Sequence, residues 1–199
     1  MESQIYSIKN GLQDKIFKFL QTAEIEKLEN ENNLNYKWFE AHGFEATEAE
    51  LTDKYSINKQ VLVVHDFRQS EHNLRDGIKN DLLESIDIVH RFIQDKRGEE
   101  DRKEYIKDEE LEKLEKVNEE IRQWLTLKIE EQGKLGLADD PVLLTSEMDT
   151  KNRKIMSVYV NLRKRPKPIK AKPTPEENEK ELEEEPVLES DKEDEKEEL

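Results

Sequence analysis

The feature that most constrains this chain is the position of its prolines. All six lie at or after Pro141, so the first 140 residues contain none. Because proline breaks a helix interior and this stretch is rich in Glu, Lys and Leu, we expect helices throughout it. Strand-like alternation is nearly absent. One aliphatic run, residues 61–64, would also fit a short buried strand, although it sits inside a longer helical pattern.

Apolar residues spaced three or four apart predict helices that each carry one apolar stripe. Six are expected, at residues 3–28, 25–41, 47–69, 71–95, 108–133 and 145–162. The pattern leaves open whether a break separates the first two. Thr47, with Glu50 three residues later, forms a capping box at the start of the third helix. The expected fold class is all-α, an elongated antiparallel bundle of about six helices followed by a disordered acidic tail.

Composition separates a folded part from a tail. Charged residues make up 41% of the chain, yet 45 of its 50 Leu, Ile, Val and Phe residues precede residue 163. Residues 163–172 carry six bases and no acid, whereas residues 176–199 carry 14 acids and three bases. We therefore expect four domains or segments. They are helices one to four in 1–98, a charged linker in 99–107, helices five and six in 108–165, and a disordered basic, Pro-rich and then acidic tail in 166–199.

Several functional classes find no support in the residues. The chain has no cysteine, no apolar run long enough for a membrane span and no phosphate-binding glycine loop. Its net charge of -16 argues against nucleic acid as a partner. The histidines have no metal-ligand spacing; they are His42, His65, His72 and His90. We expect no catalytic, cofactor-binding or metal-binding residue and no enzyme, but a binding or scaffolding module.

The last four residues form a candidate localisation signal. Lys196, Glu197, Glu198 and Leu199 resemble the Lys-Asp-Glu-Leu retrieval signal of the endoplasmic reticulum. The terminal Leu stands out because residues 189–198 contain no apolar residue. Retrieval requires a lumenal protein, and the first ten residues lack the features of a signal peptide. Either the similarity is accidental or the true N-terminus is missing.

Three segments, taken in order, resemble the C-terminal helical region of the large branch of the heat shock protein 70 superfamily. Residues 37–47 contain a Trp, an acid and a Gly, followed by the Ala-Thr pair that opens the next helix. Residues 109–125 form a helix that ends in Trp-Leu, and residues 140–168 run from Asp-Pro through a last helix to a Lys/Pro exit. The resemblance spans about residues 5–170. With the retrieval-like end, the chain is most similar to the endoplasmic-reticulum, hypoxia up-regulated type.

The resemblance implies a fold and a function. The chain would be the helical arm of a large chaperone that supports protein folding and the stress response in the endoplasmic reticulum lumen. Such an arm contacts the nucleotide-binding domain of a partner heat shock protein 70 and promotes nucleotide exchange, and the protein also holds unfolded clients. The family's ATP-binding domain is absent, so we expect a fragment that binds no ATP itself. A missing N-terminus would carry the signal peptide; without one the chain would be cytoplasmic.

Some alternatives stay open. The third and fourth helices, including His65, Arg68 and Arg75, are the candidate partner contacts, although a solvated face would explain the same residues. We expect a monomer. A free-standing coiled-coil adaptor that self-associates through the fourth and fifth helices is the competing function. The acidic segment 176–198 could also bind calcium loosely, although its simplest role is to keep the chain soluble.

Overall fold

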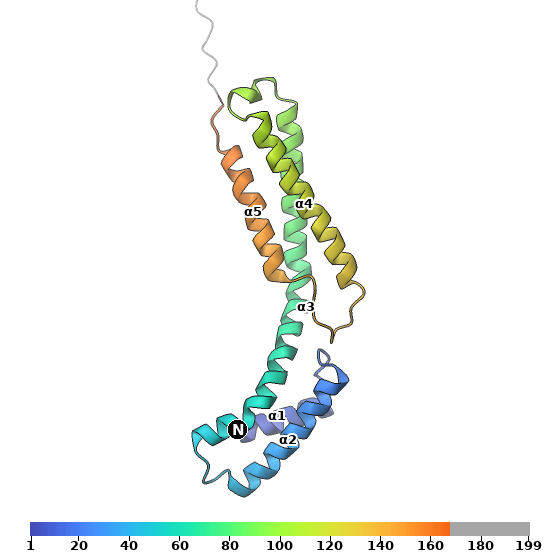
Figure 1. Cartoon of the computed structure of the whole chain (residues 1–199), viewed down its shortest axis with the longest axis vertical. Coiled ribbons are helices and arrows are strands. Elements are labelled where there is room, and N and C mark those ends of the chain that lie inside the picture. Colours follow the sequence, from blue (N-terminus) through green and yellow to red (C-terminus); the bar gives the residue numbers. More distant parts are fainter. Residues whose placement is uncertain (168–199) are drawn as a thin grey trace, which may run out of the picture. The chain divides into compact units, whose positions relative to one another are not determined.

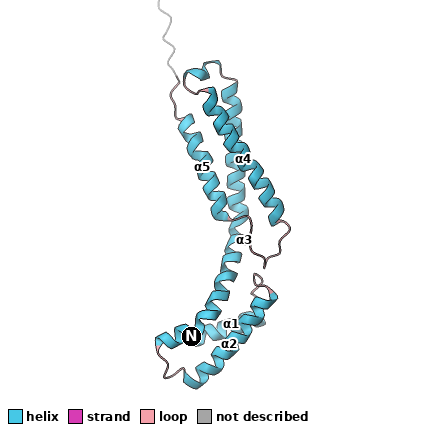
Figure 2. Cartoon of the chain, viewed as in Figure 1, coloured by secondary structure: helices cyan, strands magenta, loops and turns pink. Residues whose placement is uncertain are grey.

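The computed structural model describes residues 1–167 (Figure 1). These residues form five α-helices and one short 3-10 helix, and they contain no strand (Figure 2). The elements are α1 (Glu2–Gln13), α2 (Thr22–His42), α3 (Glu48–Arg97), η1 (Glu100–Glu104), α4 (Asp108–Gln132) and α5 (Thr145–Arg163). The all-α prediction is confirmed, and the aliphatic run at residues 61–64 lies inside α3.

The first helix is shorter than the apolar spacing predicts. It ends at Gln13, and the chain turns through Lys15, whose φ of 54° lies in the left-handed region. The side chains of Phe17 and Leu20 come from the following loop and still reach the core. Phe17 folds back on α1 at Gly11, where an added Cβ would lie only 2.8 Å from its ring. A break therefore separates the first two helices, because loop residues can continue an apolar stripe without being helical.

The third and fourth predicted helices are one helix in the structure. The prediction of a break near residue 70 is wrong, because no proline or glycine interrupts the chain there. The predicted capping box is present: Thr47 accepts a hydrogen bond from the Glu50 N–H, and the Glu50 carboxylate accepts one from the Thr47 N–H. With 50 residues, α3 is about 75 Å long at 1.5 Å per residue.

Two separate hydrophobic cores lie along α3. Near its N-terminus, α2 packs against α3, and α1 packs on α2 (Figure 1). The loop between α1 and α2 reaches α3 through the rings of Phe17 and Phe19, which contact His65. The buried residues of this core are Ile8, Phe17, Leu20, Leu28 and Val61. Farther along, α4 and α5 cover the C-terminal half of α3. This larger core includes Leu82, Ile86, Val89, Ile93, Leu114, Leu125, Met148 and Ile155. Neither group of helices could bury its apolar stripes without α3.

The charged segment after α3 is more ordered than a linker composition suggests. It contains η1, and Ile106 within it is fully buried. Arg102 is 6% exposed, donates a hydrogen bond to the Ile106 carbonyl at 3.1 Å and pairs with Asp108. Residues 1–165 form one compact unit, and the internal boundaries placed at 98/99 and 107/108 stay predictions.

The predicted disordered tail begins at the edge of the described chain. Apart from Pro166 and Lys167, residues 166–199 lie outside the described residues, and so do the retrieval-like Lys196–Leu199 and the acidic segment. None of the described helices combines the length and the apolar character that crossing a bilayer requires.

Candidate functional site

The middle of α3 carries a polar junction, which we define as His65, Arg68, Glu71 and Arg75. Their spacing of three or four residues places them on one face of the helix. His65, Arg68 and Glu71 are only 6%, 5% and 8% exposed, and Arg75 is half-buried. This face meets the loop before α2 and the loop between α4 and α5. It therefore lies where the two hydrophobic cores approach each other along α3.

Arg68 is the centre of this junction. Its Nη1 donates to the Phe19 carbonyl at 3.1 Å and to Glu24 Oε2 at 2.7 Å, while Nη2 donates to Glu24 Oε1 at 3.2 Å. Its Nε donates to Asp140 Oδ1 at 3.0 Å. The planar guanidinium suits such a set of partners because its donors form a rigid fork. One side chain thus joins α3 to the start of α2 and to the loop that precedes α5.

The contact between Arg68 and Glu24 lowers the pKa of the carboxyl group and raises the pKa of the guanidinium. Burial alone would raise the pKa of Glu24, but hydrogen bonds from Arg68 and from the Gln21 N–H bring it below its ordinary value. The hydrogen bond to Glu24 raises the pKa of Arg68 despite burial of the guanidinium. Both groups are therefore charged at neutral pH, and their attraction is part of the folded structure.

Glu71 caps the last helix from a distance. Its Oε2 accepts from the Thr145 N–H and its Oε1 from the Thr145 hydroxyl, both at 2.8 Å. An N–H at a helix N-terminus has no partner within the helix, and a carboxylate there also interacts favourably with the helix dipole. One turn later, Arg75 Nε donates to the Leu143 carbonyl at 3.1 Å. Glu71 and Arg75 together fix where α5 begins.

His65 belongs to the same junction but packs through its ring. It meets Phe17 and Phe19 edge-on, with centroid distances of 5.3 and 5.7 Å. Its Nδ1 lies 3.1 Å from Asp66 Oδ1, and its buried Nε2 has no hydrogen-bond partner among the described residues. The ring thus serves as a packing surface for the loop between α1 and α2.

The candidate contact residues named from the sequence are brought together, but they face inward. The structure gives His65 and Arg68 internal partners, and Arg75 is only partly accessible. A role for the three in partner binding stays a prediction. The sequence reasoning missed Glu24, Glu71 and Asp140, which lie 44 to 74 residues from their partners, because helical spacing carries no signal for such distant pairs.

The contacts of the junction suit holding segments of the chain together rather than catalysing a reaction. Its groups are carboxylate–guanidinium pairs and backbone carbonyls that already hold one another. Among residues 1–167, no cluster of three His, Cys, Asp or Glu residues could hold a metal ion. The expectation that the chain binds no cofactor stays a prediction.

Comparison with known proteins bears on this architecture. A family model described as the HYOU1-like C-terminal domain matches residues 93–166, from the last turn of α3 through α5. Human heat shock 70 kDa protein 4L is 27% identical over 168 residues, and the dog heat shock 70 kDa protein 4 is 25% identical over 172 residues. Each match covers 84% of this chain and 20% of the relative.

The chain is related to the C-terminal helical region of the large heat shock protein 70 branch. The predicted resemblance is thus confirmed, and the chain is similar to members of a chaperone family. It spans about a fifth of the length of the curated relatives it matches, in their C-terminal region and outside their ATPase domain. No solved structure gives a significant match.

Proposed function

We propose that this chain is the helical arm of a large heat shock protein 70-type chaperone. The arm contacts the nucleotide-binding domain of a partner heat shock protein 70 and promotes release of its nucleotide, while the protein holds unfolded clients in solution. The observation that carries the proposal is the similarity to the large branch over 84% of the chain. ATP binding would reside in the rest of such a protein.

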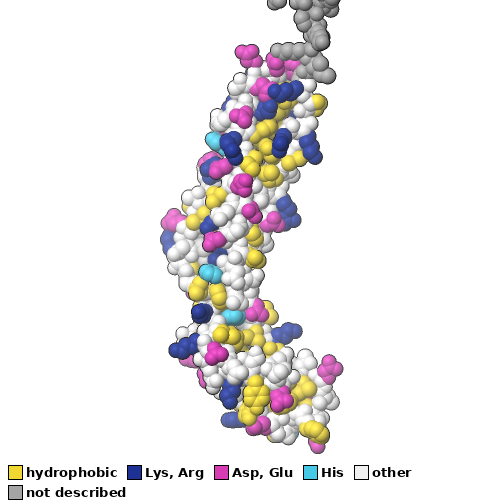
Figure 3. Space-filling model, turned by 180° about the vertical axis from the view of Figure 1, so that it is seen from behind, with side chains coloured by type: hydrophobic (Ala, Val, Ile, Leu, Met, Phe, Trp, Pro, Cys, Tyr) yellow, Lys and Arg dark blue, Asp and Glu magenta, His cyan; other side chains and the backbone are white. Residues whose placement is uncertain are grey.

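The geometry supports a contact role. A 50-residue helix supported by packing at both ends is a stiff rod with a long accessible surface. On the face shown in Figure 3, acidic and basic side chains alternate along the molecule, which suits a broad protein contact. Charged surfaces of this kind chiefly accelerate encounter and select the partner. Of the polar junction, Arg75 alone keeps enough exposure to take part.

The direct test uses nucleotide release. A partner heat shock protein 70 is loaded with fluorescent ADP, the 199-residue chain is added, and release is followed by stopped flow. We expect faster release and a stable complex by sedimentation. A chain that neither binds the partner nor accelerates release would refute the exchange role. Suppression of light scattering by a heat-denatured client tests the holding role separately.

Location in the endoplasmic reticulum lumen is a second part of the proposal, and Lys196–Leu199 supports it. A secreted reporter carrying residues 166–199 at its C-terminus should stay in the cell, and deletion of Leu199 alone should release it to the medium. Equal secretion of both reporters would leave a cytoplasmic location as the better reading.

The competing adaptor function loses its main argument. It required exposed apolar seams on the C-terminal half of α3 and on α4. The structure packs these seams on each other and on α5, with Ile86 fully buried and Leu125 1% exposed. We therefore propose a monomer. A mass from light scattering near 23.6 kDa supports it, whereas a stable dimer would return the adaptor function to consideration.

A further inference from the structure

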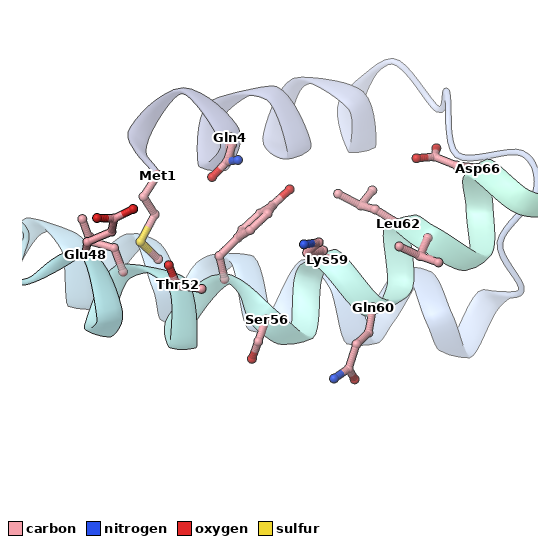
Figure 4. Close-up of a pocket in the computed structure, with 12 residues that line it drawn as sticks. Met1, Gln4, Glu48, Thr52, Ser56, Lys59, Gln60, Leu62 and Asp66 are labelled. Carbon is pink, nitrogen blue, oxygen red and sulfur yellow. The ribbon is translucent and has the colours of Figure 1, made fainter.

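A pocket of about 560 Å³ lies between the start of α1 and the end of α2. Four of its eight lining residues are aromatic, namely Tyr6, Tyr36, Phe39 and Phe44. By contrast, the larger groove between α1 and α3 is lined, within the described residues, by one ring, that of Tyr55, and by charges of both signs (Figure 4). The smaller pocket is therefore distinguished by its concentration of rings.

Contacts within the chain hold these rings in place. Tyr6 meets Tyr36 edge-on, with the ring centroids 6.1 Å apart. Phe39 lies so close to Gly43 that an added Cβ would be 2.6 Å from its ring, so glycine is required there. Phe44 comes next in the chain and is fully exposed. The pocket thus joins three partly covered rings to a fourth whose whole surface is available to a bound group.

The charges and partial charges at the pocket are mainly negative. Aromatic ring faces carry negative partial charge, and two carboxylates, those of Glu2 and Glu40, line the same pocket. Within residues 1–167 neither carboxylate has an ion-pair partner, and no basic side chain lines the pocket. The last carbonyls of α2 add partial negative charge, while Glu2 offsets the positive end of α1. A cation is the ligand that suits this surface.

The Tyr36 ring shows the same preference inside the chain. Its hydroxyl donates a hydrogen bond to Glu40 Oε1, and this bond, ahead of the neighbouring Tyr6, raises the pKa of Tyr36 to about 12. The phenol is therefore neutral at physiological pH and holds the carboxylate beside the rings. Lys9, which is not a lining residue, places its ammonium 5.9 Å from the centre of the Tyr36 ring. That distance is within the range of a cation–π contact, so the ring already accepts an ammonium group.

We propose that this pocket binds a trimethylammonium group, carried by a small molecule or by a trimethylated lysine side chain of another protein. The group has no N–H to satisfy, and its charge is spread over methyl groups that pack against ring faces. The carboxylates of Glu2 and Glu40 balance that charge. The proposal concerns a different surface from the polar junction and does not depend on nucleotide exchange.

Two other kinds of occupant suit the pocket less well. An uncharged apolar group would take Glu2 and Glu40 out of water without supplying a cation, and burying an unpaired charge is costly. An unmethylated ammonium is strongly hydrated and brings three N–H donors. The ring faces offer no oxygen or nitrogen acceptor for them, and Glu40 already accepts a hydrogen bond from Tyr36.

The test titrates the full 199-residue chain with small probes, followed by NMR. Choline is compared with neohexyl alcohol, in which carbon replaces the nitrogen, and with ethanolamine, which lacks the methyl groups. We expect choline to bind at least about threefold more tightly than either, because it alone combines the charge with the methyl groups. A peptide that carries trimethyllysine forms the second arm. Tighter binding of this peptide than of choline would identify a methylated protein as the source, and the reverse a small molecule.

The variants Tyr6→Ala and Phe67→Ala form a matched pair. Their rings are similarly exposed, at 43% and 46%, but Phe67 lies on α3 and does not line the pocket. Tyr6→Ala should weaken choline binding at least about threefold and Phe67→Ala should leave it unchanged, with folding verified by circular dichroism. Glu40→Gln keeps an acceptor for Tyr36 and removes the charge, so it should weaken binding of choline and not of neohexyl alcohol.

Three results would overturn the proposal. Equal affinities for choline and neohexyl alcohol would show an apolar pocket that does not recognise charge. Tighter binding of ethanolamine would show a site for ordinary lysine, supplied by a partner or by a second copy of the chain. Choline binding that neither Tyr6→Ala nor Glu40→Gln weakens would place the ligand elsewhere on the molecule.

Discussion

Replacing Arg68 with Met should destabilise the folded chain by about 2–4 kcal/mol. Methionine keeps the apolar stem and removes every donor. The Phe19 carbonyl then loses its buried donor, which costs about 1–3 kcal/mol. Loss of the Glu24 pair adds about 1 kcal/mol, since that side chain is 28% exposed. Asp140 is 83% exposed and adds almost nothing, since water replaces its partner.

Urea unfolding followed by circular dichroism measures this loss. With a slope of about 2 kcal/mol per molar, the midpoint should fall by about 1–2 M. Arg153→Met is the matched control, because Arg153 pairs with Asp149 on an exposed surface of α5, and it should shift the midpoint by less than about 0.3 M. A double-mutant cycle should show coupling of Arg68 with Glu24 and little with Asp140. A loss below about 1 kcal/mol for Arg68→Met would refute the view that the junction holds the fold.

Three further outcomes follow from the structure. Glu71→Ala should lower stability by about 1–2 kcal/mol in urea unfolding and should expose the Thr145 amide to hydrogen exchange, because the cap of α5 is lost. The hydrogen bonds from Arg165 lower the pKa of Glu110 to about 2 from 4.5, so its stabilising effect is present above pH 4.5 and is lost as pH falls towards 2. The urea midpoint of Glu110→Gln should therefore lie below wild type at pH 6 and converge with it near pH 2. Gly77→Ala should raise the melting temperature by an amount that reflects about 0.5–1 kcal/mol, since an added methyl group meets no atom within 4 Å; a fall would contradict an uninterrupted α3.

Local sequence rules predicted the helices well and their continuity poorly. The capping box at Thr47 and the end near Gly98 were readable because each depends on residues a few positions apart. The break after Gln13 was not, because Phe17 and Leu20 keep a helical spacing while they reach the core from a loop. The apolar stripe records which side chains are buried and says less about the backbone that carries them.

The polar junction could be predicted only as a set of residue types. The sequence offers His65, Arg68 and Arg75 as candidate partner contacts on predicted helices, and a solvated face would explain the same residues. The pattern does not say whether they face a partner or the molecule itself. Their internal partners come from loops whose path depends on packing. Trp124 packs against the larger core and stays partly exposed, with the ammonium of Lys151 4.4 Å from the centre of its ring.

The single long helix couples the two hydrophobic cores mechanically. The two cores include opposite halves of α3. Between the cores, the junction loops cover one face of α3 and leave the other face exposed. Half of α3 is about 37 Å, so a bend of about 5° at its centre would displace either end by about 3 Å. Arg68 spans that centre and resists such a bend. A small change in the contacts between Arg68 and the two junction loops would thus produce a larger movement of the helices at either end of α3.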